Sequence, residues 1–417
     1  MQKKYDVIVA GAGASGLMAA GVAAGAGAQT LLIEKMKVCG RKLRITGKGR
    51  CNITNIAEIN DFLDHIEPDR KFLYQAFSRF FSEELISFFE DIGVKTVVER
   101  GKRVFPQSSN ANDVVDALVR WNSKMGVSIL CNTRIDSLII EDNIIKGVIS
   151  GGQKFFSDKV IISTGGCSYP ATGSDGFGHK LAISAGHTIT RLRPALVPVI
   201  PSGSIHKELT GLELKNITVK LIIEGIEKDE LFGDMTFIKT GLSGPVILTL
   251  SRKIVDALGA GKKVGLSIDL KPALDENKLD ARLIREINEN GSKPFTTILK
   301  NLLPSLMIPF CIASCRISEN KKCSSITSSE RLNLLNWLKD FRIDIIGHGP
   351  FEEAIITAGG INLKEIDPRT MGSKIIKNLF FCGEILDLNA DTGGYNLQIA
   401  FSTGWVAGMA AAGAFLH

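Results

Sequence analysis

The stretch YDVIVAGAGASG (residues 5–16), followed after a short interval by TLLIEK (30–35), decides the fold of this 417-residue chain. The mostly apolar run 5–10 predicts a buried strand, and the small residues that follow favour a helix to about Gly25. Gly11, Gly13 and Gly16 form the pattern GxGxxG at the junction of that strand and helix. Together with the second strand at 30–35, this order predicts a Rossmann-like dinucleotide-binding domain.

Each residue of this fingerprint has a physical role. Gly11 permits the tight turn, Gly13 lets the backbone approach a pyrophosphate, and Gly16 allows close packing of helix on strand. The pyrophosphate would lie at the helix N-terminus, where unpaired N–H groups favour an anion. Glu34, at the end of the second strand, would accept hydrogen bonds from a ribose 2′-hydroxyl. A carboxylate there argues against a 2′-phosphate and hence against NADP in this site, which leaves NAD or FAD.

A basic stretch, GRKLRITGKGRCNITN (40–55), follows the second strand and contains no carboxylate. We expect a flexible loop that covers a large, charged ligand, which favours FAD over NAD; a solvated basic loop is the alternative. Arg41 and Lys42 are expected beside the cofactor. Lys48 and Arg50, further along, are expected to face an entering substrate. Arg44 is the fifth basic residue of the stretch.

Three later glycine-containing stretches are expected to return to the same cofactor. In STGG (163–166), which follows a predicted strand, Gly165 and Gly166 would expose backbone N–H groups. In FCGEILD (381–387), Gly383 permits close approach and Glu384 can accept hydrogen bonds from ribitol hydroxyls or reach a water. GGYNLQIAFSTG (393–404) opens a predicted helix whose first N–H groups would point at the flavin N1/O2 edge and stabilise its negative charge.

The composition changes near Pro194, where LRPALVPVIP begins. We expect residues 1–193 and 351–417 to form the two parts of one FAD-binding domain, with 194–350 as an inserted domain. Within the insertion, strand-like segments precede a mostly helical pattern from Asp275 to about Asp340. In the first part, residues 58–93 show helical spacing, 110–125 predict a helix, and 134–162 predict an antiparallel meander.

The overall composition is that of a globular protein, with 44% apolar and 23% charged residues and a net charge of +6. Eight scattered cysteines without a CxxC favour a reducing, cytoplasmic setting and argue against a disulfide reductase. Cys311, Cys315 and Cys323 are interpreted as buried apolar residues, so no metal is expected. Lys3 and Lys4 precede an apolar stretch, as in a signal peptide. We expect no signal peptide, because the glycines of GxGxxG interrupt this stretch. The apolar C-terminal stretch is too short for a membrane span and predicts a buried helix.

Four stretches carry a family resemblance. GRKLRITGKGRCNITN (40–55), STGGCSYPATGSDGFGHKLAISAGH (163–187), FIKTGLSGPVILTLS (237–251) and LFFCGEILDLNADTGGYNLQIAFSTGWVAG (379–408) resemble the YhiN/BaiN-like family of FAD-dependent (NAD(P)/FAD-binding) oxidoreductases. The region 151–190 is also similar, more distantly, to the flavin domain of fumarate-reductase-type enzymes. The resemblance implies a two-dinucleotide-binding flavoprotein with an inserted domain and non-covalent FAD. It also implies reduction of C=C bonds conjugated to a carbonyl, in steroid-like enones or in a uracil ring of ribosomal RNA.

The sequence therefore predicts an FAD-dependent oxidoreductase that transfers a hydride from flavin N5 to such a C=C bond. The alternatives are reduction of a ribosomal RNA uridine to dihydrouridine, and a non-catalytic flavin-binding sensor or interaction protein. The partners would accordingly be a small-molecule substrate or ribosomal RNA, with no membrane. No second GxGxxG is present that would hold NAD(P)H permanently, so NAD(P)H would visit as a transient electron donor, or the electrons would come from another source.

No catalytic residue is assigned, and four proton-donor candidates flank the motifs: Cys51, Cys167, Tyr169 and His179. The inserted domain is expected to cover the reactive face of the flavin, with Gly241 and Gly244 of FIKTGLSGP nearest the substrate. The full set of expected FAD-binding residues is Gly11, Gly13, Ala14, Ser15, Gly16, Glu34, Lys35, Arg41, Lys42, Gly49, Arg50, Cys51, Asn52, Ile135, Thr164, Gly165, Gly166, Gly383, Glu384, Gly393, Gly394, Tyr395, Asn396 and Leu397.

Overall fold

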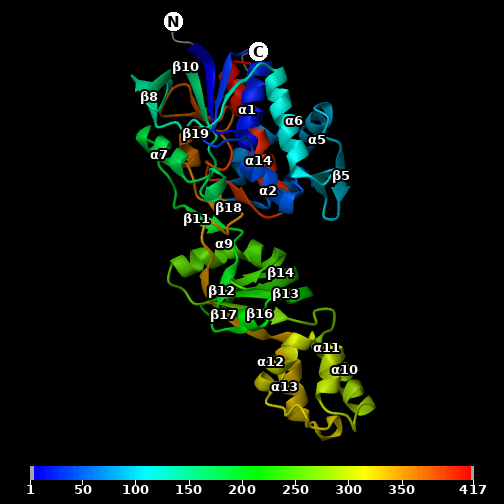
Figure 1. The fold of residues 1–417 in the computed structure, drawn as a ribbon. Helices are drawn as coiled ribbons and strands as arrows, with labels where there is room; N and C mark the ends of the chain where they lie inside the picture. Colours follow the sequence, from blue (N-terminus) through cyan, green and yellow to red (C-terminus); the bar gives the residue numbers. More distant parts are fainter. Residues whose placement is uncertain (1–3, 415–417) are drawn as a thin grey trace. The chain divides into compact units, whose positions relative to one another are not determined.

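A computed structural model describes residues 4–414, which divide into two compact units (Figure 1). Unit 1 contains the chain up to Ala195 and again from Phe351, and unit 2 contains Leu196–Pro350. The sequence placed the corresponding breaks at 194 and 350. Each unit has its own apolar core, one built from residues 5–185 and 361–411 and the other from residues 199–345.

The centre of unit 1 is a parallel sheet formed by the predicted strands. Its order is β21 (Leu379–Phe381), β10 (Gln153–Ile162), β1 (Lys4–Ala10), β2 (Thr30–Ile33) and β7 (Ser128–Leu130). Every neighbouring pair in this series is parallel, and β1, β2 and the end of β10 are buried. The first strand therefore lies between the two strands whose carboxyl ends carry Glu34 and STGG. This arrangement brings these motifs to one edge of the sheet.

Short antiparallel strands extend this sheet on the β10 and β21 sides. β9 (Ile144–Ser150) pairs with β10, and β8 (Ser137–Glu141) pairs with β9, which gives the antiparallel meander expected at 134–162. Beyond β21 lie β20 (Gly372–Ser373) and β19 (Ile366–Asp367).

Two helices from opposite ends of the chain, α1 (Ala14–Gly25) and α14 (Tyr395–Ala412), lie side by side in unit 1 (Figure 1). Gly404 and Gly408 make this possible, because an added Cβ would overlap the Ser15 carbonyl at Gly404 and lie 2.6 Å from the Ala19 carbonyl at Gly408. Asn110 caps α6 (Ala111–Lys124), so the helix expected there is present. Residues 58–93 form several short helices rather than one. The remaining helices of unit 1 are α2 (Arg41–Gly49), α3 (Ile59–Leu63), α4 (Tyr74–Phe77), α5 (Ser82–Asp91) and α7 (Phe177–Ser184).

Three small sheets join distant segments of unit 1. β3 (Thr54–Asn55) and β5 (Thr96–Glu99) flank β6 (Arg103–Pro106). β4 (Ile66–Glu67) pairs with β22 (Asn389–Ala390), and β11 (Arg193–Ala195) pairs with β18 (Ile356–Ala358). The second sheet ties the loop before α14 to the segment that follows α3.

Unit 2 is a closed six-stranded barrel with a helical insertion. The barrel order is β12 (Val199–Pro201), β15 (Gly241–Ser243), β14 (Ile226–Ile238), β13 (Glu213–Ile223), β16 (Val264–Asp269) and β17 (Phe341–His348). α8 (Ile205–Glu208) and α9 (Pro245–Gly259) belong to the barrel region. Between β16 and β17 the chain forms α10 (Glu276–Glu289), α11 (Thr296–Leu302), α12 (Ile308–Cys315) and α13 (Ser328–Lys339).

The sequence predicted strands followed by helices in this unit, and the observed order differs in two places. One barrel strand, β17, follows the helices, and α9 lies among the strands. Buried and exposed residues alternate along 341–346, as in a strand. The sequence analysis did not separate this strand from the helical pattern that ends at Asp340. Among residues 4–414, no helix combines the length and the apolar character that a bilayer crossing requires.

Candidate functional site

The GxGxxG turn has the geometry that its glycines require. Gly11 has φ +100°, and an added Cβ would lie 2.8 Å from the Ser163 carbonyl oxygen. A Cβ on Gly16 would overlap the carbonyl oxygen of Gly11. Both positions exclude any other residue because backbone lies against them. The turn is thus packed on the strand end that carries STGG.

Gly13 differs from its two neighbours because nothing lies near it. It has an ordinary φ of −80°, and no heavy atom lies within 4 Å of an added Cβ. It is the N-cap of α1, and no side chain caps this helix. The open space therefore faces the uncapped N–H groups of Ala14 and Ser15. Such a position accepts an anion such as a pyrophosphate.

Glu34 lies just past the end of β2 and is buried. Its Oε2 accepts a hydrogen bond from the Ala12 N–H at 2.7 Å, and its Oε1 accepts one from the Met36 N–H at 2.8 Å. These bonds fix the carboxylate beside the glycine turn. An ionised carboxylate offers about four acceptor positions, so it can still accept from two ribose hydroxyls.

The C-terminal motif returns to the same turn through Gly383. This residue has φ +78°, and an added Cβ would overlap Ser15 Oγ. Its N–H donates to Thr403 Oγ1 at 3.0 Å, which ties the end of β21 to α14. The structure thus brings together the expected residues Ser15 and Gly383, which are far apart in the sequence.

The N-terminus of α14 lies against β3. Gly394 has φ +102°, and an added Cβ would overlap the backbone of Thr54. Asn55 Nδ2 donates to the Gly393 carbonyl at 3.1 Å, and the Asn396 side chain bonds the backbone of Ala390. No side chain caps the helix. The N–H groups of its first turn therefore have no side-chain cap, and their contact with a flavin stays a prediction.

The basic stretch forms a helix, which corrects the expectation of a flexible loop. α2 begins at Arg41, and its regular geometry ends where Thr46, Gly47 and Lys48 leave helical dihedral angles. The sequence analysis did not predict this helix because Gly47 and Gly49 indicated a loop. Gly49 lies directly after this kink.

Carboxylates from other segments balance most of the basic stretch. Lys42 pairs with Glu384 at 2.8 Å, Arg44 pairs with Asp116 at 2.7 Å, and Arg50 pairs with Glu99. Arg50 also lies over the ring of Phe105. Arg41 and Lys48 are exposed.

The pair Lys42–Glu384 is the centre of a polar network. Glu384 Oε1 accepts from Ser168 Oγ at 2.9 Å and from the Thr357 N–H at 2.8 Å. Thr357 Oγ1 in turn accepts from the N–H of Cys167 at 2.7 Å. Burial alone would raise the pKa of Glu384, but the Lys42 charge and these hydrogen bonds outweigh it and hold the pKa below its usual range.

This network changes the interpretation of Glu384. With two bonds on Oε1 and one on Oε2, the carboxylate has about one acceptor position left for a ribitol hydroxyl. Ser168 and Thr357 were missed by the sequence analysis; Ser168 lies two residues after the glycines of STGG, and Thr357 lies two residues before Gly359. Gly166 fits the same place, because an added Cβ would overlap Thr357 Oγ1.

Three more of the expected residues, Lys35, Gly165 and Ile135, have defined surroundings in unit 1. Lys35 pairs with Asp175 at 2.7 Å, and Gly173 lies against Met36. Gly165 has φ +74° and faces Ser174. Ile135 is buried in the core of unit 1.

Two of the proton-donor candidates are closed to a substrate. Cys51 is fully buried, and burial raises the pKa of its thiol to about 12. His179 is buried, and burial lowers the pKa of its ring. Cys167 is half-buried, and burial followed by the charge of Glu384 raises the pKa of its thiol. Both Cys167 Sγ and His179 Nδ1 lie within 4.0 Å of an added Cβ on Gly176. Tyr169 has φ +49°.

The donor and acceptor set of unit 1 fits FAD. Gly13 leaves a cradle that a Cβ would fill, and α1 and α14 each present uncapped N–H groups. Asn52 Oδ1 and Thr164 Oγ1 are buried and make no hydrogen bond with any residue of 4–414. Both belong to the expected FAD-binding set. Buried polar atoms of this kind normally find a partner, and the hydroxyl, ribityl and ring groups of FAD supply such partners.

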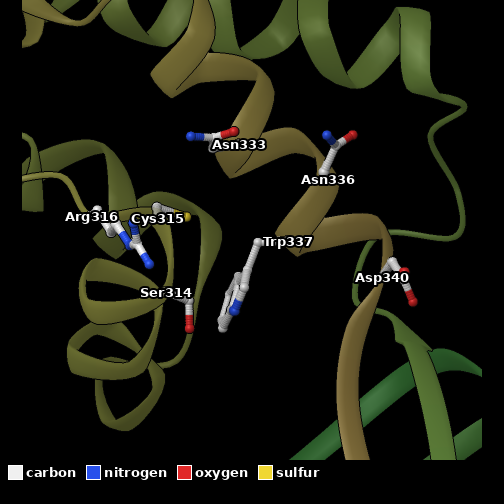
Figure 2. Close-up of a pocket in the computed structure, with 7 residues that line it drawn as sticks. All are labelled: Ser314, Cys315, Arg316, Asn333, Asn336, Trp337 and Asp340. Carbon is white, nitrogen blue, oxygen red and sulfur yellow. The ribbon is translucent and has the colours of Figure 1, made fainter.

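Unit 2 contains a hollow of about 450 Å³ in its helical part (Figure 2). Its lining residues come from the end of α12 and from α13: Ser314, Cys315, Arg316, Asn333, Asn336, Trp337 and Asp340. None of the expected FAD-binding residues is among them. Asp340 is already bonded to Ser267 and Arg342. Cys311 and Cys323 are buried nearby in the core, and the described part of the chain contains no cluster suited to a metal.

A comparison with protein families gives one match over nearly the whole chain. The family described as "HI0933-like protein Rossmann domain" matches residues 5–410. The chain belongs to the HI0933-like family. Relatives of this HI0933-like protein include a 3-dehydro-bile acid delta(4,6)-reductase of Clostridium scindens, which is 30% identical over 97% of this chain and 98% of its own length. A ribosomal RNA dihydrouridine synthase of Escherichia coli is 29% identical over 97% of both chains.

Solved structures show the same fold. The 3-ketosteroid delta1-dehydrogenase of Sterolibacterium denitrificans matches 99% of this HI0933-like chain and all of its own, with a TM-score of 0.51 and 13% identity. The 3-ketosteroid-delta4-(5alpha)-dehydrogenase of Rhodococcus jostii matches 98% and 97%, with a TM-score of 0.50 and 15% identity. The expected family, the Rossmann-type α/β class and the assignment as an FAD-dependent oxidoreductase are confirmed.

Proposed function

We propose that this HI0933-like protein reduces a C=C bond conjugated to a carbonyl, with non-covalently bound FAD as its cofactor. The observation that carries the proposal is the 30% identity, over almost the full length of both chains, to a reductase that acts on a 3-dehydro bile acid. The uncapped N-termini of α1 and α14 in unit 1 support the cofactor.

Different residues of unit 1 would bind different parts of FAD. Gly13, Ala14 and Ser15 bind the pyrophosphate, and Glu34 holds the adenosine ribose. Gly383 allows the cofactor to approach the end of β21, while the first turn of α14 stabilises charge at the flavin N1/O2 edge. Reduced FAD, once bound, supplies a hydride at N5. Unit 1 would thus be the FAD-binding domain and unit 2 the inserted domain.

NAD(P)H visits the enzyme as a transient electron donor. The enzyme works in the cytoplasm, where its eight cysteines stay reduced.

Purified protein tests the cofactor and the reaction together. We expect a yellow protein that releases FAD on acid precipitation, and whose dithionite-reduced flavin is reoxidised without oxygen by a 3-keto-4-ene steroid to give the saturated ketone. Protein that cannot be loaded with FAD would exclude the proposal. Protein that holds FAD but reduces no conjugated acceptor would favour the non-catalytic flavin-binding sensor.

A second candidate reaction is reduction of a ribosomal RNA uridine to dihydrouridine. It is favoured by the full-length similarity to ribosomal RNA dihydrouridine synthases, at 29% and 26% identity, and fits the net charge of +6. Neutralising the exposed Lys48 should leave FAD bound. If RNA is the substrate, this change should weaken RNA binding and lower its salt slope by about one unit. A wild-type affinity for a ribosomal RNA fragment that does not depend on salt would remove this candidate.

A further inference from the structure

A histidine–carboxylate pair lies at the N-terminus of α14; Asp391 belongs to the stretch 379–408, whereas His65 lies outside the motifs that the sequence analysis selected. His65 precedes β4 and Asp391 follows β22, and these two short strands pair with each other. The Asp391 N–H donates to the His65 carbonyl at 3.1 Å, which fixes the two residues opposite each other. His65 Nδ1 and Asp391 Oδ2 are 2.9 Å apart.

The hydrogen bond defines the tautomer of His65. An ionised carboxylate only accepts hydrogen bonds, so the proton between the two side chains resides on Nδ1. Nε2 makes no hydrogen bond with any other residue in the described part of the chain. The imidazole is 41% exposed, whereas the Asp391 side chain is 18% exposed. The pair thus presents one free ring nitrogen to an incoming molecule and keeps the orienting carboxylate behind it.

Tyr395 fixes the ring in place beside the helix start. The His65 and Tyr395 rings are stacked, with centroids 4.3 Å apart and planes at 24°. Phe62 supports Tyr395 edge-on at 4.7 Å, and an added Cβ on Gly393 would lie 2.6 Å from the Tyr395 ring. Burial, then the charges of Asp391 and Asp61, raises the pKa of Tyr395, so its phenol stays protonated at neutral pH. His65 is therefore stacked directly on the first residue of α14.

We propose that His65 is the residue that delivers the proton to the substrate, with Asp391 as its positioning residue. This inference rests on the proposed reductase function. The first turn of α14 is the place assigned to the flavin edge, so a substrate stacked on the flavin comes within reach of an exposed group anchored on Tyr395. Histidine is the side chain that most often serves as a general acid or base in enzymes.

The step balances with the groups named. The hydride from flavin N5 forms a C–H bond at the β carbon, and the C=C electron pair moves towards the carbonyl oxygen. The doubly protonated ring of His65 then gives its Nε2 proton to the α carbon, which yields the saturated ketone and leaves the neutral Nδ1–H imidazole. Solvent returns the proton to the exposed Nε2. Asp391 accepts the Nδ1–H bond throughout and keeps the ring oriented.

The other ionisable groups near this helix are less suited to the step. Cys51 is fully buried, and Lys42 and Glu384 are paired with each other. His65 alone among these combines exposure, a free nitrogen and an orienting partner.

His65→Gln tests the proposal in two half-reactions. Dithionite-reduced enzyme is mixed in a stopped-flow instrument with a 3-keto-4-ene steroid or, in a separate arm, with ribosomal RNA. We expect reoxidation by the productive acceptor to fall about 100-fold. Reoxidation by ferricyanide should not change, because that acceptor takes electrons without a proton on carbon. Asp391→Asn should lower the first rate about 10-fold and leave the second unchanged.

Two further measurements separate this role from a structural one. Flavin fluorescence should show the same FAD affinity in wild type and His65→Gln. Ring ¹⁵N spectra of the cofactor-free wild type should show a protonated Nδ1 on His65 that changes in Asp391→Asn. The matched control is Asp64→Asn, which removes the neighbouring exposed ion pair with Arg70 and should alter neither rate.

The outcomes are distinct. If wild type reduces a conjugated acceptor and His65→Gln does so within about threefold, the proton-donor role is wrong and the reductase function stands. If wild type holds FAD and reacts with ferricyanide but with neither conjugated acceptor, the reductase function fails and this inference fails with it. An Nδ1 that is unprotonated in wild type would contradict the assigned roles directly.

Discussion

At the residue scale, the Lys42–Glu384 pair yields a stability prediction. Both side chains are 22% exposed, so Lys42→Met would leave a mostly buried carboxylate without its cation. We expect a loss of about 1.5–3 kcal/mol in the unfolding free energy of the cofactor-free protein. Trp337 is the tryptophan of unit 2, so a Trp337→Phe background lets Trp121 and Trp405 report urea unfolding of unit 1. Lys48→Met, at an exposed position, is the matched control and should cost nothing.

The same pair has a defined pH dependence. The folded pKa of Glu384 is lowered, so its stabilising contribution is complete above the unfolded value of about 4.3 and is lost as pH falls through the folded value. The difference between wild type and Lys42→Met should therefore be constant near neutral pH and shrink in acid. A difference that grows on acidification would contradict this account of the network. Sequence alone named both residues as separate ligands. It could not show that they pair, because spacing along a chain does not reveal contacts between distant segments.

At the scale of elements, two glycines beside α1 should respond in opposite ways. Gly13→Ala adds a methyl group to open space at an ordinary φ, so the stability of the cofactor-free protein should change by less than about 1 kcal/mol. FAD affinity, measured by quenching of flavin fluorescence, should fall at least tenfold because the methyl group occupies the pyrophosphate position.

Gly404→Ala places its methyl group on the Ser15 carbonyl and forces α14 away from α1. We expect destabilisation of about 1–3 kcal/mol, measured by the same urea titration, with FAD affinity lost as a consequence. If Gly13→Ala destabilised the protein and Gly404→Ala did not, the assignment of packing and ligand roles would be reversed.

The sequence predicted some of these helices and strands and missed others. β1, α1, β2 and α14 were predicted because strand, glycine and helix signals coincide there. α2 was missed because glycines dominate its end, and Ser168, Thr357 and His65 were missed because their roles depend on tertiary neighbours. The pairing of β4 with β22, which places His65, involves strands of only two residues each, too short to leave a periodic pattern.

At the scale of the whole molecule, the two units should fold separately. Their cores share no residue. In unit 1, Ala195 pairs with Ile356, so the points where the chain leaves and returns are close together. In unit 2, Val199 pairs with His348, and the Gly349 N–H bonds the Pro198 carbonyl at 2.9 Å. Each unit can therefore be closed by a short linker without strain on its sheet.

We expect a chain in which a short Gly/Ser linker replaces residues 196–350 to fold and to bind FAD with near wild-type affinity, because every residue assigned to the cofactor lies in unit 1. Residues 196–350 alone should fold as a barrel, judged by circular dichroism, and bind no FAD; they serve as the control. The expectation that the inserted domain covers the reactive face of the flavin stays a prediction, and the shortened chain tests it. If the expectation holds, reduced flavin in that chain should react with oxygen and ferricyanide but lose its conjugated substrate, because the cover is gone. Undiminished enone reduction by unit 1 alone would show that substrate binding and proton delivery both belong to the FAD-binding domain.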